Sequence, residues 1–402
     1  MMKQINFKRG GISMFIVVIA GSLVTLVTAS FIRIVTRDQM GASNLDLSQS
    51  AYDSAQTGVE DAKRFMITWS TRCKNGLDLT THQRECSQMA TALATDSCTV
   101  LSSAGIGSAT GETQIQTENE SGSSGNDLNQ AYTCVKIRKD TPDFLGGLAE
   151  GNSRTIPLKS SQSFNKVRIS WHTRKNMKDP NGTISLLSPS GENFSLPSAA
   201  EWNGTTTATN RPAILKAQFY GYRSGRNLED LDGNFSTTGT GLDEQLYYPV
   251  RIGVNSHSLP LSRRSGNSSS THNFSGVRCA DSTISQEYAC RTEVSLGHTV
   301  QPADIAFLRL SALYTDADFK VELMNNDRVV HFDGVQPIVD STGRANDKFR
   351  RVESRIEFED SNFPVPDFAV QTQGSEGICK DFWVTNETNS FEHGSSQKNC
   401  NL

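Results

Sequence analysis

The sequence contains eight cysteines, and thiols are the side chains in it whose chemistry is easiest to anticipate. An even number of cysteines in a polar chain that follows one apolar segment is typical of disulfides formed in an oxidising compartment. The chain has no CxxC motif, and no cysteines and histidines have the spacing of a zinc site, so we expect no metal. The cysteines are Cys73, Cys86, Cys98, Cys134, Cys279, Cys290, Cys379 and Cys400.

The pairing of these cysteines is not readable from the sequence, because eight cysteines allow roughly a hundred connectivities. Pairing between neighbours is the simplest arrangement, and each bridge would stabilise the fold by roughly 3–4 kcal/mol through the lost freedom of the unfolded chain. A set of buried free thiols is the alternative. The expected pairs are Cys73–Cys86, Cys98–Cys134, Cys279–Cys290 and Cys379–Cys400.

Motifs that indicate an enzyme are missing from the sequence. It contains no GxSxG, HExxH, P-loop or GxGxxG in a strand–helix context. The seven histidines are scattered, so each is expected at the surface or in a sheet and not as a catalytic base. We therefore expect no catalytic residue and no cofactor. A catalytic pair of residues distant in the sequence, assembled only by folding, is the alternative.

One acidic stretch has some of the features of a calcium loop. Asp230, Asp232 and Asn234 place hard oxygen ligands at alternate positions, as calcium loops do. The glycine stands at the fourth position instead of the sixth, and no glutamate stands at the twelfth. A solvated acidic turn is therefore favoured over a calcium site.

The overall composition is that of an ordinary soluble protein attached to one apolar segment. The chain has 402 residues, of which 36% are hydrophobic and 20% charged. The formal net charge is only −4, so no nucleic-acid partner is expected.

The apolar segment near the N-terminus has the length of a membrane span. Residues 12–32 are 21 uncharged residues, and as a helix they would be roughly 31 Å long, about the thickness of a bilayer core. Lys3, Lys8 and Arg9 precede them and keep the short N-terminus in the cytoplasm. A cleavable secretory signal is the competing interpretation, because Val27-Thr28-Ala29 before Ser30 is similar to a signal-peptidase site.

The helical pattern continues beyond the apolar segment, which argues against cleavage before Ser30. One apolar stripe recurs at spacings of three and four residues, and polar residues occupy the other faces. The sequence therefore predicts a single helical rod over residues 12–69, with its membrane part at 12–36, about 55 residues and about 80 Å long. The stripe is formed by Tyr52, Ala55, Val59, Ala62, Met66 and Trp69.

The remainder of the chain has the patterns of antiparallel strands. In "DKFRRVESRIEF", Val352, Ser354, Ile356 and Phe358 share one face, and Arg351, Glu353, Arg355 and Glu357 share the other. "VQPIVDSTGRANDKFRRVESRIEF" predicts a hairpin with its turn in the polar "STGR". Residues 102–127 are rich in Gly, Ser and Thr and predict a long loop. Further strands are expected at 133–139, 166–172, 213–223, 246–254, 288–296, 305–313 and 319–323.

The stretch "RDQMGASNLDLSQSAYDSAQTGVEDAKRF" resembles the corresponding region of type IV pilin-like proteins, in particular the PilX-type minor pilins. The matching positions are Ala51, Ala55, Gly58, Glu60 and Ala62. The hairpin near the C-terminus is similar, more weakly, to the closing hairpin of minor pilins. The resemblance implies a basic leader over residues 1–11, cut after Gly11 by prepilin peptidase, so that Ile12 becomes an N-methylated first residue.

The resemblance also implies an α+β fold, in which a long N-terminal membrane-spanning and amphipathic helix packs on an antiparallel β-rich globular head. The expected organisation is the leader 1–11, the helix 12–69, a cysteine-containing loop region 70–150, and a β-rich exported head 151–402. The head would include an inserted β-rich module at roughly 150–300 and end in a cysteine loop between Cys379 and Cys400. One departure is clear, since most pilins have glutamate at the fifth mature position, where this chain has Ile16.

The function implied is that of a minor pilin of a type IV pilus or related filament, present in few copies at or near the tip. It would aid pilus assembly and surface attachment. Its partners would be other pilin subunits, which it contacts through the helix, the assembly machinery and prepilin peptidase, with a surface or host-cell ligand unknown. It would reside in the cytoplasmic membrane before assembly and at the cell surface afterwards. A membrane-anchored surface adhesin that never polymerises is the alternative.

Overall fold

A computed structural model describes most of the chain between Gly10 and Glu357. The first nine residues of the expected leader, Phe358 and the expected Cys379–Cys400 loop lie outside the described residues. The described residues are 10–74, 82–95, 97–115, 117–118, 124–125, 129–179, 182–186, 199–204, 209–223, 225–227, 230, 233–250, 274–280 and 288–357.

A single long helix opens the fold. Helix α1 runs without interruption over Gly10–Thr68 and passes into a π-helical turn, η1, at Trp69–Lys74. The continuous rod expected at 12–69 is thus present, because no proline interrupts the segment and the apolar run leads directly into the amphipathic one. The chain combines this helix with mainly antiparallel sheets, so the α+β class is also confirmed.

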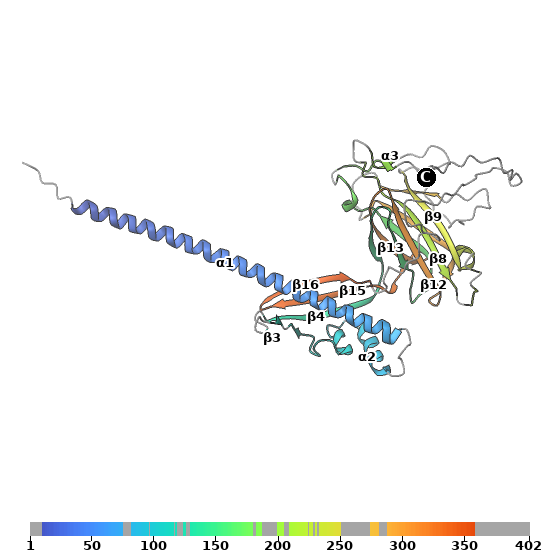
Figure 1. Ribbon diagram of the computed structural model, residues 1–402, viewed down its shortest axis with the longest axis horizontal. Helices are drawn as coiled ribbons and strands as arrows, with labels where there is room; N and C mark the ends of the chain where they lie inside the picture. The colour runs from blue at the N-terminus through green and yellow to red at the C-terminus, as the bar shows by residue number, and fades with distance from the viewer. Residues whose placement is uncertain are drawn as a thin grey trace, which may run out of the picture. The chain divides into compact units, whose positions relative to one another are not determined.

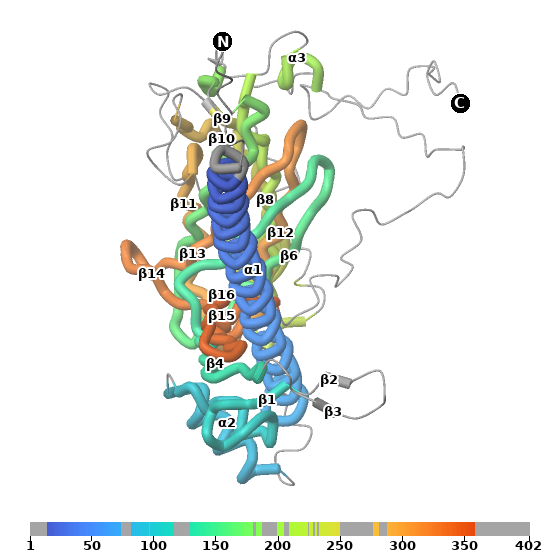
Figure 2. Tube along the Cα trace, turned by 90° about the vertical axis from the view of Figure 1, so that its left-hand side faces the viewer, coloured from blue at the N-terminus to red at the C-terminus, as the bar shows by residue number. Residues whose placement is uncertain are grey.

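The second half of α1 lies on a four-stranded antiparallel sheet, as both Figure 1 and Figure 2 show. The strand order is β1-β4-β15-β16. The strands are β1 (Thr113–Gln114), β4 (Gln130–Thr141), β15 (Phe332–Ala345) and β16 (Lys348–Arg355). Their inner face and the helix enclose a core that includes Val59, Ala62, Phe65, Met66, Tyr132, Val135, Ile137, Val339 and Ile356.

The helix approaches β15 so closely that only small residues fit between them. A Cβ atom on Gly343 would lie 2.1 Å from the Ala51 carbonyl oxygen and 2.2 Å from the Ala55 nitrogen. From the helix side, a Cβ on Gly58 would lie 2.4 Å from Ser341 Oγ. Glycine at 343 on the sheet and at 58 on the helix is therefore required for this close contact.

Short elements and two disulfides close the end of this core. Helix α2 spans Gln83–Ala94 and the 3₁₀ helix η2 spans Val100–Ala104. Cys73 at the end of the rod is bonded to Cys86 in α2, and Cys98 before η2 is bonded to Cys134 in β4. The short strands β2 (Thr117–Glu118) and β3 (Ser124–Gly125) pair with each other within the stretch that was expected to be a loop.

A second module consists of two five-stranded sheets among the described strands. One sheet has the order β10-β9-β8-β12-β6, antiparallel except for the parallel β9–β10 pair. The other has the order β11-β7-β13-β14, with β5 also paired to β13. The bounds are β5 Phe144–Leu148, β6 Ser153–Pro157, β7 Phe164–Trp171, β8 Ile214–Tyr222, β9 Gly241–Val250, β10 Phe274–Arg278, β11 Cys290–Val300, β12 Ile305–Leu313, β13 Ala317–Asn325 and β14 Arg328–Val330.

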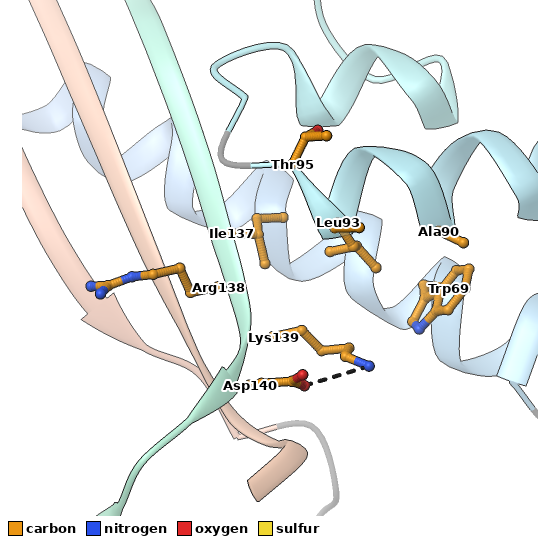
Figure 3. A pocket seen from close by; sticks show the side chains of 9 residues that line it. Trp69, Ala90, Leu93, Thr95, Ile137, Arg138, Lys139 and Asp140 are labelled. Carbon is orange, nitrogen blue, oxygen red and sulfur yellow. Dashed lines mark ion pairs between the residues drawn. The ribbon is translucent and has the colours of Figure 1, made fainter. Parts of the chain in front are cut away.

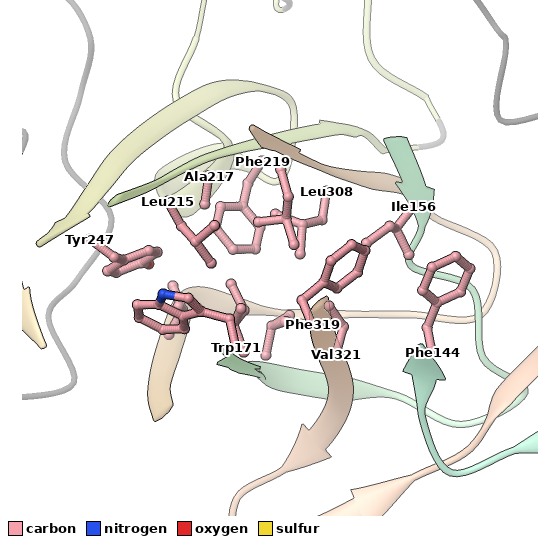
Figure 4. Packing of buried hydrophobic residues seen from close by; sticks show 14 of the residues in the cluster. Phe144, Ile156, Trp171, Leu215, Ala217, Phe219, Tyr247, Leu308, Phe319 and Val321 are labelled. Atoms are coloured by element: carbon pink, nitrogen blue, oxygen red, sulfur yellow. The ribbon is translucent and has the colours of Figure 1, made fainter. Parts of the chain in front are cut away.

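These two sheets share one large apolar core (Figure 4). Trp171 of β7 faces Tyr247 of β9 with ring centroids 6.4 Å apart, and the Trp171 indole N–H donates to the Ala213 carbonyl at 2.9 Å. The third disulfide, Cys279–Cys290, lies in the same core. Smaller helices attached to this sandwich are η3 (Arg174–Asn176), α3 (Ala199–Asn203) and α4 (Phe235–Thr238).

The sandwich is inserted between two neighbouring strands of the first sheet, and this changes the expected domain boundaries. Strand β4, expected within a cysteine-containing loop region at 70–150, is an interior strand that pairs with β15. The strands of the sandwich occupy residues 144–330, so the inserted module is longer than the range 150–300 and no boundary falls at residue 151. Periodicity predicts strands but not their partners, and β4 and β15 are nearly two hundred residues apart in the sequence.

The turn of the last hairpin also differs from the expectation. The "STGR" residues 341–344 belong to β15, and the chain reverses at Asn346 and Asp347, between the paired Ala345 and Lys348. Asn346 has φ of 50°, a left-handed conformation that asparagine adopts readily. Ser341 is fully buried and Gly343 contacts the α1 backbone, so this polar sequence is required by packing and not by a turn. From Arg351 onward the burial follows the predicted alternation, with Arg351, Glu353 and Glu357 exposed, Val352 and Ser354 half-buried and Ile356 buried, except that Arg355 is half-buried as well.

The glycine contact gives a stability prediction. Gly343→Ala places a Cβ against two backbone atoms of α1, and we expect the free energy of unfolding to fall by about 2–3 kcal/mol because neither backbone can yield. The measurement is denaturant unfolding of the full chain in detergent, followed by tryptophan fluorescence. Gly41→Ala is the matched control, because nothing lies within 4 Å of that position, and it should stabilise by about 0.5–1 kcal/mol through helix propensity. Equal effects of the two substitutions would contradict the packing argument.

Candidate functional site: the uncovered half of the long helix

The first half of α1 exposes a continuous apolar surface. From Met14 to Leu47 its large apolar side chains are each between 55% and 75% exposed, apart from half-buried Val35 and Leu47, whereas Ala51, Ala55, Ala62 and Phe65 in the second half are fully buried. The exposed residues are Met14, Phe15, Ile16, Val17, Val18, Ile19, Leu23, Val24, Leu26, Val27, Phe31, Ile32, Ile34, Met40 and Leu45. Such a surface needs an apolar environment, because water around it is unfavourable.

The polar atoms of this half are suited to an apolar environment. Each of five hydroxyl groups donates to a carbonyl of its own helix at 2.7–2.9 Å, so no side-chain donor among them needs water. By length and composition, α1 is the one helix in the described part of the chain that could cross a membrane, with a mean hydropathy of 2.4 over its most apolar window. The five hydroxyls belong to Ser22, Thr25, Thr28, Ser30 and Thr36.

The residues expected at the processing site lie at the start of this helix. Gly11 and Ile12 are in the first turn of α1, which begins at Gly10. Ile16, the fifth residue from Ile12, is 61% exposed, and the first turn of α1 contains no acidic residue. Among the described residues, the first turn of the helix thus supplies no carboxylate at the beginning of the apolar surface.

Polar contacts connect α1 to the sheet, one of them at the point where the helix passes from exposed to covered and one within the covered half. Arg350 Nε of β16 donates to Ser48 Oγ at 2.7 Å, and Tyr132 Oη of β4 donates to Asp61 Oδ2 at 2.9 Å. Burial, reinforced by Asp61, raises the pKa of Tyr132 to about 12, so the phenol stays a donor at neutral pH. Glu60 points outward and forms an ion pair with Lys63 at 2.5 Å. Sequence reasoning identified neither Ser48 nor Arg350, because their pairing is set only by the fold.

A groove lies beside the covered end of α1 (Figure 3). Its volume is about 500 Å³, and its walls come from the end of the rod, α2 and β4. Lys139 at its rim is 2.7 Å from Asp333 and 3.5 Å from Asp140, so its charge is balanced within the chain. The lining offers apolar contact without a nucleophile or an unbalanced charge. It consists of Trp69, Ala90, Leu93, Ala94, Thr95, Ile137, Arg138, Lys139 and Asp140.

The acidic stretch does not assemble a calcium site among the described residues. The Asp230 carboxylate accepts the Asn227 backbone N–H at 2.9 Å, and Asn234 precedes α4. Asp232 lies outside the described residues. Within the part of the chain that the structure describes, no three His, Cys, Asp or Glu side chains are placed to hold a metal ion.

Two histidines are packed into the sandwich. His172 at the end of β7 is fully buried, and burial lowers its pKa to about 4. His298 packs edge-on against Phe235 at 4.7 Å between ring centroids, and burial lowers its pKa as well. Both imidazoles are therefore neutral side chains of the fold near pH 7.

Comparison of the chain with protein-family models, with curated proteins and with solved structures finds no match. Inference of the function therefore depends on the geometry of the helix and of the sheets that hold it. What this arrangement offers is an apolar helical surface available to lipid or to other helices, on a helix whose second half packs against a four-stranded sheet.

The buried histidine gives a pH prediction. Between pH 6.5 and about 4 the unfolded chain binds a proton at residue 172 that the folded chain does not, so stability must fall as the pH falls through this window. The pKa difference between the two states corresponds to a loss of about 3 kcal/mol in the free energy of unfolding across the whole window. His172→Asn, which suits the φ of 69° at this position, should remove that part of the acid sensitivity.

The measurement is the midpoint of urea unfolding of the full chain in detergent at pH 7 and pH 4.5. His331→Asn is the control, because His331 is exposed, and it should follow the unsubstituted chain. The same pH dependence in His172→Asn and in the unsubstituted chain would contradict the prediction.

Proposed function

We propose that this chain is a minor pilin of a type IV pilus or a related filament. The observation that supports the proposal is the division of α1 into an uncovered apolar half and a half seated by Ala51, Ala55 and Gly58 on an antiparallel sheet. A subunit that passes from membrane to filament needs such a helix, because its apolar half must be buried first in lipid and then among other helices. The resemblance of residues 37–65 to PilX-type minor pilins agrees with this assignment.

Processing and export follow from the same proposal. Prepilin peptidase would cut after Gly11, and Ile12 would become the first, N-methylated residue of the mature subunit. The subunit would wait in the cytoplasmic membrane, enter the filament through the assembly machinery and contact other pilin subunits through α1. The three disulfides among the described residues suit an exported body in an oxidising compartment.

Ile16 and the inserted sandwich favour few copies and a position at or near the tip. In most pilins, the glutamate at the fifth mature position pairs with the amine of a neighbouring subunit inside the apolar core, and an unpaired ammonium there is unfavourable. A subunit with no neighbour ahead of it does not need that carboxylate. The sandwich over residues 144–330 would crowd a shaft in which it was repeated, whereas at the tip it could contact surfaces.

The same isoleucine favours a second candidate, a membrane-anchored surface adhesin that does not polymerise. Without the carboxylate at residue 16, the helix is a sufficient anchor by length and composition. The two candidates share the exported β-rich body and differ in whether the helix leaves the membrane.

Processing distinguishes the glycine leader from an ordinary signal peptide. We expect N-terminal sequencing of the mature chain to begin at Ile12, and Gly11→Leu to abolish that product. The control is Gly10→Leu, which changes the residue preceding Gly11 and keeps the glycine at the cleaved bond. It should leave some mature chain. A mature N-terminus at Ser30 would contradict the pilin proposal, and an uncut chain would support the anchored adhesin.

Filament fractions test the position of the subunit. We expect mass spectrometry of sheared filaments to detect this chain in small amounts, and gold labelling of its exported body to mark filament ends. Assembly should proceed without a glutamate at residue 16, and Ile16→Glu should allow gold labels along the shaft. Recovery of the chain only with membranes would refute the filament proposal, and regular labelling of the shaft by the unsubstituted chain would refute the tip position.

A further inference from the structure

Two arginines stand together at the outer end of the apolar run of α1. Arg33 and Arg37 are separated by four residues, so their side chains leave the same face of the helix, one turn apart. Both side chains are exposed. The helix thus carries two adjacent positive charges on one face directly after its apolar surface.

No acidic side chain of the described residues balances these charges. Neither Arg33 nor Arg37 forms an ion pair or a hydrogen bond with another residue that the structure describes. The helix neighbours of the pair at spacings of three and four are uncharged, namely Ala29, Ser30, Ile34, Thr36, Met40 and Gly41. Asp38 follows Arg37 directly and therefore leaves the helix about 100° away from it.

The position of the pair along the helix corresponds to the phosphate layer of a membrane. The 21 uncharged residues 12–32 span roughly 31 Å as a helix, about one hydrocarbon core. Lys8 and Arg9 stand before that core on the cytoplasmic side, so Arg33 falls at the opposite lipid–water boundary. Long arginine side chains reach from this depth to the headgroups while their stems stay among the acyl chains.

We propose that Arg33 and Arg37 form a binding site for the phosphate of an anionic phospholipid headgroup in the outer leaflet of the cytoplasmic membrane. Guanidinium groups bind phosphate oxygens through paired charge-assisted hydrogen bonds, and two of them on adjacent turns can hold one headgroup from two sides. The inference rests on the proposed membrane insertion of α1. It gives the subunit a lipid ligand before assembly, and that ligand fixes how deeply α1 is inserted in the membrane.

The test uses the full chain purified in mild detergent, with phosphatidylglycerol and phosphatidylcholine added in equal amounts and bound lipid counted by native mass spectrometry. We expect the unsubstituted chain to retain phosphatidylglycerol in preference. R33Q/R37Q should lower that retention roughly thirty-fold, because each arginine contributes about fivefold through its attraction to the anionic surface. K63Q/R64Q is the matched control, since it removes the same charge from the same helix where Glu60 and Asp61 already pair with it; its retention should not change.

Several outcomes would overturn the site. Equal phosphatidylglycerol retention by the unsubstituted chain and R33Q/R37Q would do so, as would an equal loss of both lipids. Displacement of the lipid by millimolar inorganic phosphate would make free phosphate the ligand. An effect of R33Q/R37Q on filament recovery without any effect on lipid would assign the pair to a protein partner. Release of the chain from membranes by carbonate would instead refute membrane insertion, and the lipid site with it.

Discussion

The close approach of α1 to β15 is the constraint on which the packing of the helix against the four-stranded sheet depends. The backbone of the helix at Ala51 and Ala55 touches the sheet at Gly343, and Gly58 faces Ser341 in the same way. At this separation Val59, Phe65 and Met66 of the helix pack into the core between helix and sheet. Any side chain on Gly343 would lift the rod and open that core, so two glycines and two alanines hold the rod in place.

This seat divides one uninterrupted helix into two halves that have different environments. From Met14 to Leu45 the apolar side chains are exposed apart from half-buried Val35, and from Ser50 onward the inner face is buried. The Arg350–Ser48 hydrogen bond lies at the division. Because the covered half is fixed by packing, by Tyr132 and by the Cys73–Cys86 disulfide beyond it, the exposed half projects from a rigid base. The proposed roles of lipid anchor and filament contact both need this rigidity.

Much of the fold was predictable from the sequence, because local patterns determine it. The rod follows from an uncharged run joined to a stripe of period 3.6, and strands such as 305–313 follow from their apolar and β-branched residues. Three neighbouring cysteine pairs are bonded in the structure.

The parts that the sequence did not reveal depend on contacts between distant residues. Nothing local indicates that β4 pairs with β15, or that "STGR" is a strand under a helix. A glycine inside a strand pattern was the available signal of close backbone approach at Gly343. The unbalanced arginines at 33 and 37 were visible in the sequence, but their exposure and lack of partners needed the structure.

The way the sandwich joins the first sheet has an evolutionary consequence. Thr141 at the end of β4 pairs with Phe332 at the start of β15, so the chain leaves and re-enters the sheet at one place. All strands of the sandwich lie between these two residues. A gene segment encoding this module could be lengthened, replaced or lost while the rod keeps its seat, because the two strand ends would still meet. Surface recognition and helix assembly are thereby free to diversify separately in descendants of this chain.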